Sequence, residues 1–363
     1  MATVSILRLA RCGAKCPQAA GTVLVQKRNK SDLPLTSYKR GKGGRSSFNG
    51  TVATIFGATG QVGRSLVNRL GKSGSQVIIP YRGDVSDVAP LKLCGDLGQI
   101  LFVPCQLDDE EALRKSIQYS NVVINCTGSD NETRNWSFEK VHVEGPRNIA
   151  RIARECGVKT LVHFSAMNAS PDPQKVFLKD GSGFLKSKYK GELAVREEFP
   201  EATIFRPSEI FGSEDRFILY YCHKVKYPVY VDDVTEGLLK VIYNPETAGK
   251  TYELLGPEPY YLSDLVRYFL DGTRIQFFRI TDIGFLFRMK ILRQSLILLD
   301  FPIDCITDNP TGAPTLEDLG VKLTRIEEKA VFIHKALKKG GYYDEALGEF
   351  PDTPPPPAAN FMN

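Results

Sequence analysis

The stretch Val52-Ala53-Thr54-Ile55-Phe56-Gly57-Ala58-Thr59-Gly60-Gln61-Val62-Gly63-Arg64 decides the fold of this chain. An apolar run ends at Gly57, three glycines follow G-x-x-G-x-x-G spacing, and a helical pattern of apolar residues begins directly afterwards. This order predicts a strand, a tight turn and the N-terminus of a helix. Glycines remove the Cβ atoms that would keep the backbone away from a pyrophosphate, and the helix start offers unpaired N–H groups and a positive dipole end. The stretch therefore predicts a dinucleotide site, against the alternative of an ordinary glycine-rich turn.

Strand and helix patterns alternate on the C-terminal side of this stretch. Strands are expected at Val52–Phe56, Gln76–Pro80, Ile100–Pro104, Asn121–Cys126, Thr160–Ser165 and Thr203–Phe205, and helices at Gln61–Lys72, Glu110–Ile117, Phe138–Glu155 and Phe184–Glu198. Such alternation predicts an α/β fold, a Rossmann-type doubly wound parallel sheet with helices on both faces. Further patterns, helical at Asp233–Tyr243 and Ser263–Leu270 and extended at Thr251–Leu255, predict a smaller mixed α/β lobe at the C-terminal end.

Composition and local bias divide the chain into five parts. Residues 1–31 carry six basic residues and no acidic one, without a long apolar core, which is typical of a mitochondrial transit peptide; a disordered basic tail is the alternative. Residues 32–50 read as a flexible, basic, glycine-rich connector. The NADP-binding Rossmann domain is expected over 51–215, the smaller lobe over 216–350, and a proline-rich extended tail over 351–363.

The net charge of +5 belongs to the leader. Without its six basic residues, 41 basic residues stand against 42 acidic ones, so the rest of the chain gives no support for nucleic-acid binding. The eight cysteines form no C-x-x-C pair and the four histidines are far apart, so no metal site is expected.

Side chains at the ends of the expected strands indicate which dinucleotide is bound. The second strand leads into Arg82 rather than into an acidic residue that would accept the ribose 2′-hydroxyl of NAD. A cation there favours the 2′-phosphate of NADPH, with Arg64 as a second charge; the alternative is that Arg82 is a surface arginine that begins a loop. Asp108, after the third strand, is placed to reach the adenine, and the small residues 125–128 are suited to pass under the nicotinamide ribose.

The chain resembles the extended and atypical short-chain dehydrogenase/reductase superfamily. The matching motifs are Gly57-x-x-Gly60-x-x-Gly63, Asp108, Asn125–Gly128, Arg206–Gly212 and Tyr230–Val234. Longer strings resemble a family of nucleotide-binding accessory subunits of mitochondrial NADH:ubiquinone oxidoreductase (complex I): Gly41–Ser47, Gly95–Gln99, Asn121–Asn125, Ser213–Phe217 and Thr315–Gly320. This narrower resemblance spans about residues 39–350. It implies a tightly held NADPH, a position on the matrix side of the inner membrane, and a structural or assembly role beside other complex I subunits.

Active members of the superfamily use a Tyr-x-x-x-Lys pair on one helix, in which the lysine lowers the pKa of the tyrosine. When this chain is aligned on Lys188, Phe184 stands at the tyrosine position and has no proton to give. Tyr189 is adjacent to Lys188 and points to another face, and Ser165 is followed by Ala166 and Met167 where family members often place the hydroxyl. We therefore expect a site that binds the cofactor without catalytic residues.

The predicted cofactor-binding residues are Gly57, Thr59, Gly60, Gln61, Val62, Gly63, Arg64, Arg82, Asp108, Cys126, Thr127, Gly128, Ser165, Lys188 and Pro207. The leading hypothesis is a non-catalytic accessory subunit of complex I that holds NADPH as a structural cofactor. The alternative is an active NADP-dependent reductase or epimerase of the matrix, and a free RNA- or lipid-associated matrix protein has less support.

Two segments bear on partners. The apolar stretch 283–303 contains Arg288, Lys290, Arg293 and Asp300, so it is a poor membrane span. It is expected either to lie on the inner-membrane surface or a partner as an amphipathic helix, or to be buried in the lobe. Only nine residues lie between Phe217 and Tyr227, where relatives carry a longer segment that covers the substrate. This short 218–226 connection weakens the expectation of a small-molecule pocket.

Overall fold

The computed structural model describes residues 44–130, 132–175, 181–212, 225–273, 306–330 and 353–359. The chain divides into two units, 1–34 and 35–363, and every described residue belongs to the second. The expected transit peptide, most of the connector and the apolar stretch 283–303 lie outside the described residues.

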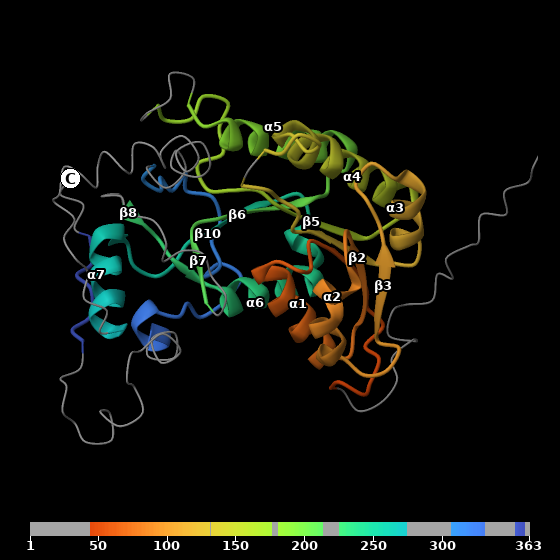
Figure 1. Cartoon of the computed structure of the whole chain (residues 1–363), viewed down its shortest axis with the longest axis horizontal. Coiled ribbons are helices and arrows are strands. Elements are labelled where there is room, and N and C mark those ends of the chain that lie inside the picture. Colours follow the sequence, from red (N-terminus) through yellow and green to blue (C-terminus); the bar gives the residue numbers. More distant parts are fainter. Residues whose placement is uncertain are drawn as a thin grey trace, which may run out of the picture. The chain divides into compact units, whose positions relative to one another are not determined.

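A parallel sheet forms the centre of the fold (Figure 1). Within the described residues it has seven strands in the order β10-β6-β5-β4-β1-β2-β3. The strands are β1 Val52–Phe56, β2 Gln76–Tyr81, β3 Ile100–Pro104, β4 Val122–Asn125, β5 Thr160–Phe164, β6 Thr203–Pro207 and β10 Thr251–Leu254. The order reverses on either side of β1, and ligands of open α/β sheets bind at such a switch point, beyond the carboxyl ends of the strands. The expected Rossmann-type α/β fold is confirmed.

Helices cover both faces of the sheet (Figure 1). On one face, α1 (Gln61–Lys72), the short α2 (Val85–Val88) with the 3-10 turn Ala89–Cys94, and α6 (Val231–Tyr243) bury an apolar cluster that includes Leu66, Val88 and Leu238. On the other face, α3 (Glu110–Ile117), α4 (Gly145–Glu155) and α5 (Gly183–Glu198) bury a second cluster that includes Ile149 and Val195. The central strands are covered on both sides, which explains their nearly continuous apolar sequences.

The strand expected at residues 251–255 forms, but it does not belong to a separate lobe. As β10 it pairs in parallel with β6, Thr251 opposite Ile204 and Leu254 opposite Pro207, and so extends the main sheet. The physical reason is burial: Tyr252 and Leu254 are almost fully buried and join the same apolar cluster as α1 and α6.

The remaining elements gather beyond the carboxyl end of β6. Two short pairs form there, β7 (Ile210–Phe211) with β9 (Val229–Tyr230) and β8 (Val225–Lys226) with β11 (Tyr260–Tyr261). Helix α7 (Leu262–Thr273) follows. A third apolar cluster joins these elements through Phe211, Tyr260 and Phe269. In the described part of the tail, the Ala359 N–H donates to the Pro259 carbonyl (2.8 Å), so the extended arm lies along this region. The 3-10 turn Pro245–Thr247 lies instead at the amino end of β6, where the Thr203 hydroxyl donates to the Thr247 carbonyl (3.0 Å).

Residues 44–50 differ from the expected flexible connector. The Asn49 N–H donates to the Gly74 carbonyl (3.1 Å), its amide nitrogen reaches the Tyr243 hydroxyl (3.0 Å), and the Ser46 hydroxyl donates to Asp96 (2.7 Å). A Cβ at Gly74 would lie 2.5 Å from the Ser47 carbonyl oxygen, so the two segments are in close contact. This end of the connector is therefore fastened to the domain by hydrogen bonds, although residues 44–46 remain exposed.

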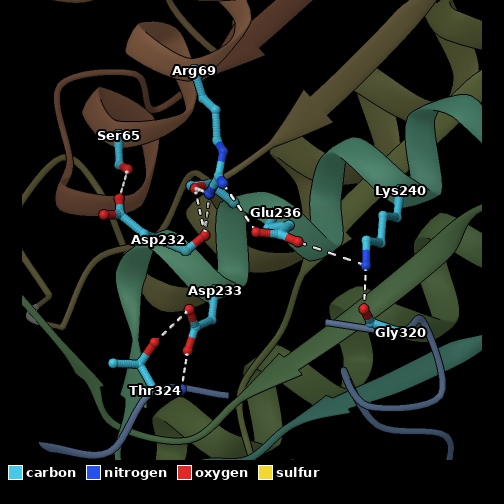
Figure 2. A network of polar contacts seen from close by, with 9 residues as sticks. Ser65, Arg69, Asp232, Asp233, Glu236, Lys240, Gly320 and Thr324 are labelled. Atoms are coloured by element: carbon cyan, nitrogen blue, oxygen red, sulfur yellow. Dashed lines mark hydrogen bonds and ion pairs between the residues drawn. The ribbon is translucent and has the colours of Figure 1, made fainter. Parts of the chain in front are cut away.

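Helix α1 is tied to α6 and to the segment after residue 310 by a polar network (Figure 2). Arg69 of α1 donates to the backbone carbonyl of Asp232, to the Thr235 hydroxyl (3.2 Å) and to the Glu236 carboxylate (3.0 Å). The Ser65 hydroxyl donates to Asp232 (2.9 Å). On the far side of α6, both carboxylate oxygens of Asp233 accept hydrogen bonds from Thr324, and Lys240 donates to the Gly320 carbonyl. Helix α1, which begins at the glycine-rich turn, is thus fixed to α6, and α6 in turn is fixed to the segment that contains Gly320 and Thr324.

Candidate functional site

The site is built around the turn between β1 and α1. Gly57 has a φ of +77°, and a Cβ there would lie 2.7 Å from the carbonyl oxygen of Cys126, which follows β4. A Cβ at Gly63 would lie 2.5 Å from the Gly57 carbonyl oxygen. Two glycines are therefore required by the folding of the turn on itself and on the end of β4. Gly60 is the N-cap of α1, and no side chain caps the helix there.

The first residues of α1 present backbone donors to the solvent side of this turn. Because a helix leaves its first N–H groups without intrahelical partners, Gln61, Val62 and their neighbours offer an anion site at the carboxyl edge of the sheet. The Gln61 side-chain nitrogen is buried and has no hydrogen-bond partner among the described residues. Arg64 donates through Nε to the Thr59 carbonyl (2.8 Å), which places its side chain along the turn. This geometry fits the pyrophosphate of a dinucleotide.

Arg82 and Asp108 lie at neighbouring strand ends. Arg82 directly follows β2, is exposed, and places its guanidinium 5.1 Å from the ring centroid of Trp136. Asp108 lies in the exposed turn between β3 and α3, directly before Asp109, whose carboxylate caps α3 by accepting from the N–H groups of Glu111 and Ala112. Arg82 is on the adenosine side of the turn, where a 2′-phosphate would lie.

The residues after β4 form a tightly held loop. The Asn125 side-chain oxygen accepts from the Thr127 N–H (3.0 Å) and hydroxyl (2.6 Å), and its nitrogen faces Nδ1 of His163 (3.2 Å). Burial raises the pKa of the Cys126 thiol to about 12, so this side chain is uncharged and packs as a small apolar group below the turn. A Cβ at Gly128 would lie 3.2 Å from the Lys188 ammonium nitrogen, so the loop reaches α5.

Lys188 and Phe184 share one face of α5, as their spacing predicts. The Lys188 ammonium donates to the Phe164 carbonyl at the end of β5 (3.3 Å) and lies 5.7 Å from the centroid of the Phe184 ring. Burial lowers the pKa of Lys188 to about 8, partly offset by the charge of Asp130. The hydroxyl of Ser165 is buried next to these groups and has no partner among the described residues. Lys188 thus provides an amine and Ser165 a hydroxyl. At the position from which a tyrosine would supply the proton, however, the chain has Phe184, whose phenyl ring has no hydroxyl.

Tyr189 is the residue directly after Lys188 in α5, so it lies about 100° further around the helix axis and does not share the face of Phe184 and Lys188. On the same helix, Glu192 accepts two hydrogen bonds from Arg206 of β6 (2.9 and 2.6 Å). Pro207 ends β6, and its carbonyl accepts from the Met167 N–H (2.9 Å). The structure thus brings Cys126, Gly128, Ser165 and Lys188 to one end of the sheet beside the turn, while Arg82 and Asp108 lie on the other side of it.

Sequence reasoning missed His142, which organises this end of the site. It lies in a π-helical turn, Lys140–Glu144, that precedes α4. The Ser129 N–H donates to Nε2 of His142 (3.1 Å), and Nδ1–H donates to the Ser187 hydroxyl (2.8 Å), which in turn donates to the Phe184 carbonyl (2.7 Å). Burial and the nearby Lys188 charge lower the pKa of His142 to about 3, so the ring is neutral with the proton on Nδ1. Isolated histidines give no sequence signal for this role.

A second buried polar cluster, also missed, lies beyond the end of β6. Lys226 is nearly fully buried, 3.5 Å from the carboxylates of both Asp308 and Glu209. Asp308 also accepts from the Ser208 hydroxyl and the Tyr227 N–H (3.2 Å). The cluster fastens the segment around residue 308 to the ends of β6 and β8.

Metal-binding and membrane-spanning features do not occur in the described part of the chain. Its histidines, cysteines and carboxylates form no group of three or more that could hold a metal ion. The cysteines at 94, 105, 126 and 156 are not joined by disulfide bonds. No helix among the described residues has the length and apolar character needed to cross a membrane.

Comparisons with known proteins agree with the geometry. Residues 53–227 match the NAD dependent epimerase/dehydratase family, which supports binding of a nucleotide cofactor. The chain is 42% identical over 344 residues to the mouse (Mus musculus) mitochondrial NADH dehydrogenase (ubiquinone) 1 alpha subcomplex subunit 9, covering 88% of this chain and 89% of that protein. It is 33% identical to the protein of the same name from Dictyostelium discoideum, covering 88% and 95%. The fold is also that of WbmG, a Bordetella bronchiseptica enzyme solved with NAD and UDP, with a TM-score of 0.57, 14% identity, and coverage of 81% of this chain and 95% of that one.

Proposed function

The chain belongs to the family of the mitochondrial NADH dehydrogenase (ubiquinone) 1 alpha subcomplex subunit 9, and from this premise we propose that it is an accessory subunit of mitochondrial complex I. The observation that carries the proposal is the 42% identity to the mouse protein across 88% of the chain. Likeness over that length extends well beyond the nucleotide-binding half. The subunit lies peripherally on the matrix side of the inner membrane, in contact with other complex I subunits, and residues 1–31 direct it there.

NADPH is the structural cofactor of this subunit. Gly57 and Gly63 let the turn pack closely on itself and on the end of β4, where a Cβ would meet backbone atoms. In this conformation the first N–H groups of α1 are available to the pyrophosphate. Arg82 supplies a cation at the position where an NAD site carries a carboxylate, so the 2′-phosphate is favoured. A ligand that binds only the folded chain stabilises it by about 4 kcal/mol when its concentration is a thousand times Kd.

The subunit carries out no turnover of its own. The phenyl ring of Phe184 stands 5.7 Å from the Lys188 ammonium, in the place from which a tyrosine would transfer its proton. Lys188 keeps a binding role as a hydrogen-bond donor on the nicotinamide side, beside the Phe164 carbonyl.

An active NADP-dependent reductase is the second candidate. It is favoured by the Ser165 hydroxyl, which is buried next to Lys188. This hydroxyl has no hydrogen-bond partner among the described residues. The two functions differ in the fate of the bound nucleotide. A structural cofactor stays reduced when the purified chain is incubated with a small-molecule extract of the matrix, whereas a reductase oxidises it.

The experiment for the cofactor compares Arg82→Glu with Lys159→Glu. Both change one exposed side chain by two charge units, but Lys159 lies at the amino edge of the sheet, directly before β5. We expect the unaltered chain and the Lys159 variant to retain NADPH through purification, and the Arg82 variant to lose most of it together with its thermal stabilisation. Equal NADPH content in both variants would contradict the assignment of Arg82.

The subunit role is tested by tagging the chain in mitochondria and purifying it from mildly solubilised membranes. We expect complex I subunits to dominate the proteins that accompany it. Recovery of the chain without them would contradict the proposal.

A further inference from the structure

The contact between Arg82 and Trp136 joins two parts of the chain that are 54 residues apart. Arg82 is the first residue after β2, and Trp136, the only tryptophan of the chain, lies in the segment 132–138 between β4 and α4. The guanidinium carbon is 5.1 Å from the centroid of the indole. A cation within about 6 Å of an indole face is attracted by the ring quadrupole. The pair is therefore an attractive contact between two segments that the sequence keeps apart.

Sheet topology places this contact beside the glycine-rich turn. The strand order β4-β1-β2 puts β1 between the two strands that the contact joins. Neighbouring strands are about 4.8 Å apart, so the carboxyl ends of β2 and β4 flank the end of β1 at a distance of about 10 Å from each other. A dinucleotide whose pyrophosphate lies on the turn has its adenosine half beside β2. Both side chains are therefore at the adenosine end of the proposed site.

The segment that carries Trp136 has a defined shape. Thr133 and Trp136 exchange two backbone hydrogen bonds, from the Thr133 N–H to the Trp136 carbonyl (2.9 Å) and from the Trp136 N–H to the Thr133 carbonyl (3.2 Å). The Phe138 N–H donates to the Glu132 carboxylate (2.9 Å). These bonds close a tight loop with the indole at its end.

The connection from β4 is also fixed at its base. His142 accepts from the Ser129 N–H (3.1 Å), and its ring stacks on Phe138 with 5.5 Å between the centroids. His142 is itself held by the Ser187 hydroxyl of α5 (2.8 Å). The indole is thus presented to Arg82 by a framework anchored on both sides of the segment.

The cation–π contact with the indole uses no hydrogen-bond acceptor of the protein. All five N–H groups of an arginine lie in its plane and point outward, in a fork that matches phosphate oxygens. The indole restricts the rotamers of an otherwise exposed arginine and offers no oxygen acceptor that would compete with phosphate for those N–H groups. The contact therefore pre-organises Arg82 for an anion.

We propose that Trp136 is a specificity-determining residue of the nucleotide site: its indole holds Arg82 where the 2′-phosphate of NADPH binds, and so favours NADPH over NADH. This inference rests on the proposed function, in which the chain binds NADPH. It assigns the discrimination to a pair of side chains from two separate segments, after β2 and after β4, rather than to Arg82 alone.

The experiment removes any nucleotide that the purified full chain carries and then titrates the chain with NADPH and with NADH by calorimetry, for the unaltered protein, Trp136→Phe and Trp136→Leu. A cation–π contact corresponds to a factor of about 3 to 30 in affinity between exposed and desolvated settings. We expect Trp136→Leu to weaken NADPH binding by about that factor, to change NADH binding less than twofold, and Trp136→Phe to be intermediate. In the unaltered protein, the fluorescence of the single tryptophan should fall as NADPH binds, through energy transfer to the reduced nicotinamide.

The control variant is Tyr119→Leu, an exposed aromatic residue at the amino side of β4. It should leave both affinities unchanged, and circular dichroism should show all variants folded. NADPH binding that is equal or tighter in Trp136→Leu would overturn the inference while leaving the proposed function standing. Equal losses for NADPH and NADH would also overturn it, because a merely structural role predicts them. An unaltered protein that binds neither nucleotide overturns the proposed function itself, and the inference with it.

Discussion

Replacement of Gly57 by alanine tests the glycine-rich turn most directly. The backbone of Gly57 has a φ of +77°, a conformation that L-residues rarely adopt. The added Cβ would lie 2.7 Å from the Cys126 carbonyl oxygen, 2.8 Å from its carbonyl carbon and 3.1 Å from the Thr127 nitrogen. These are backbone atoms, and the N–H groups of Cys126 and Thr127 donate to the Phe56 carbonyl (3.0 Å) and to the Asn125 side chain (3.0 Å), so they cannot turn away as a flexible side chain would.

Two costs add in this variant. The left-handed conformation costs an alanine about 1–2 kcal/mol, and forcing a methyl group into a packed site costs about 1–3 kcal/mol. We expect the free energy of unfolding of the nucleotide-free chain to fall by about 2–5 kcal/mol. Affinity for NADPH should fall as well, because the displaced Cys126–Thr127 backbone borders the proposed nicotinamide side.

Gly98→Ala is the matched control. Gly98 has a φ of +80°, and nothing lies within 4 Å of the position that a Cβ would take there, so its variant bears only the conformational cost. Urea titrations followed by circular dichroism give both free energies of unfolding. A Gly57 variant within about 0.5 kcal/mol of the Gly98 variant would refute the close approach of the turn to β4, because no steric cost would then be present.

Two other predictions follow from buried charge and from the α1–α6 network. Burial lowers the pKa values of His142 and His163 to about 3, so between pH 6.5 and 3 the unfolded chain binds protons that the folded chain does not. The free energy of unfolding should therefore decrease with falling pH by about 1.4 kcal/mol per pH unit per histidine. Urea titrations from pH 7.5 to 5 should show a shallower dependence on pH for His163→Gln than for the unaltered chain, and an unchanged slope would contradict this. Arg69→Ala removes three hydrogen bonds to α6 and should lower the free energy of unfolding by about 1–2 kcal/mol. Arg154→Ala loses one largely exposed ion pair and should lower it by less than about 1 kcal/mol in the same assay. Equal losses in the two variants would contradict the stabilising role of the α1–α6 network.

Local patterns were sufficient for much of the fold. The glycine spacing at 57, 60 and 63 and the alternating apolar runs predict β1, α1 and the parallel sheet. Each of these elements has its own hydrophobic periodicity and its own residues that mark its ends. The i, i+4 spacing of Phe184 and Lys188 likewise places both on one face of α5, where the structure has them.

Contacts between distant segments were not predictable in this way. The strand at Thr251–Leu254 is indistinguishable by sequence from a lobe strand, and only its burial against β6 assigns it to the main sheet. Trp136 and His142 carry no motif, since each acts through a partner more than ten residues away: Arg82 for the indole, Ser129 and Ser187 for the imidazole. The packed end of the connector depends in the same way on a surface that no local pattern reveals.

The central claim is that this chain is a complex I subunit that holds NADPH. It is tested by separating mildly solubilised mitochondria on a native gel, probing for the chain, and measuring NADPH extracted from the same band. We predict that the chain migrates with complex I activity and that the band yields about one extra NADPH per complex, which Arg82→Glu removes. Migration of the chain at the mass of its own monomer or dimer, away from that activity, would contradict the account.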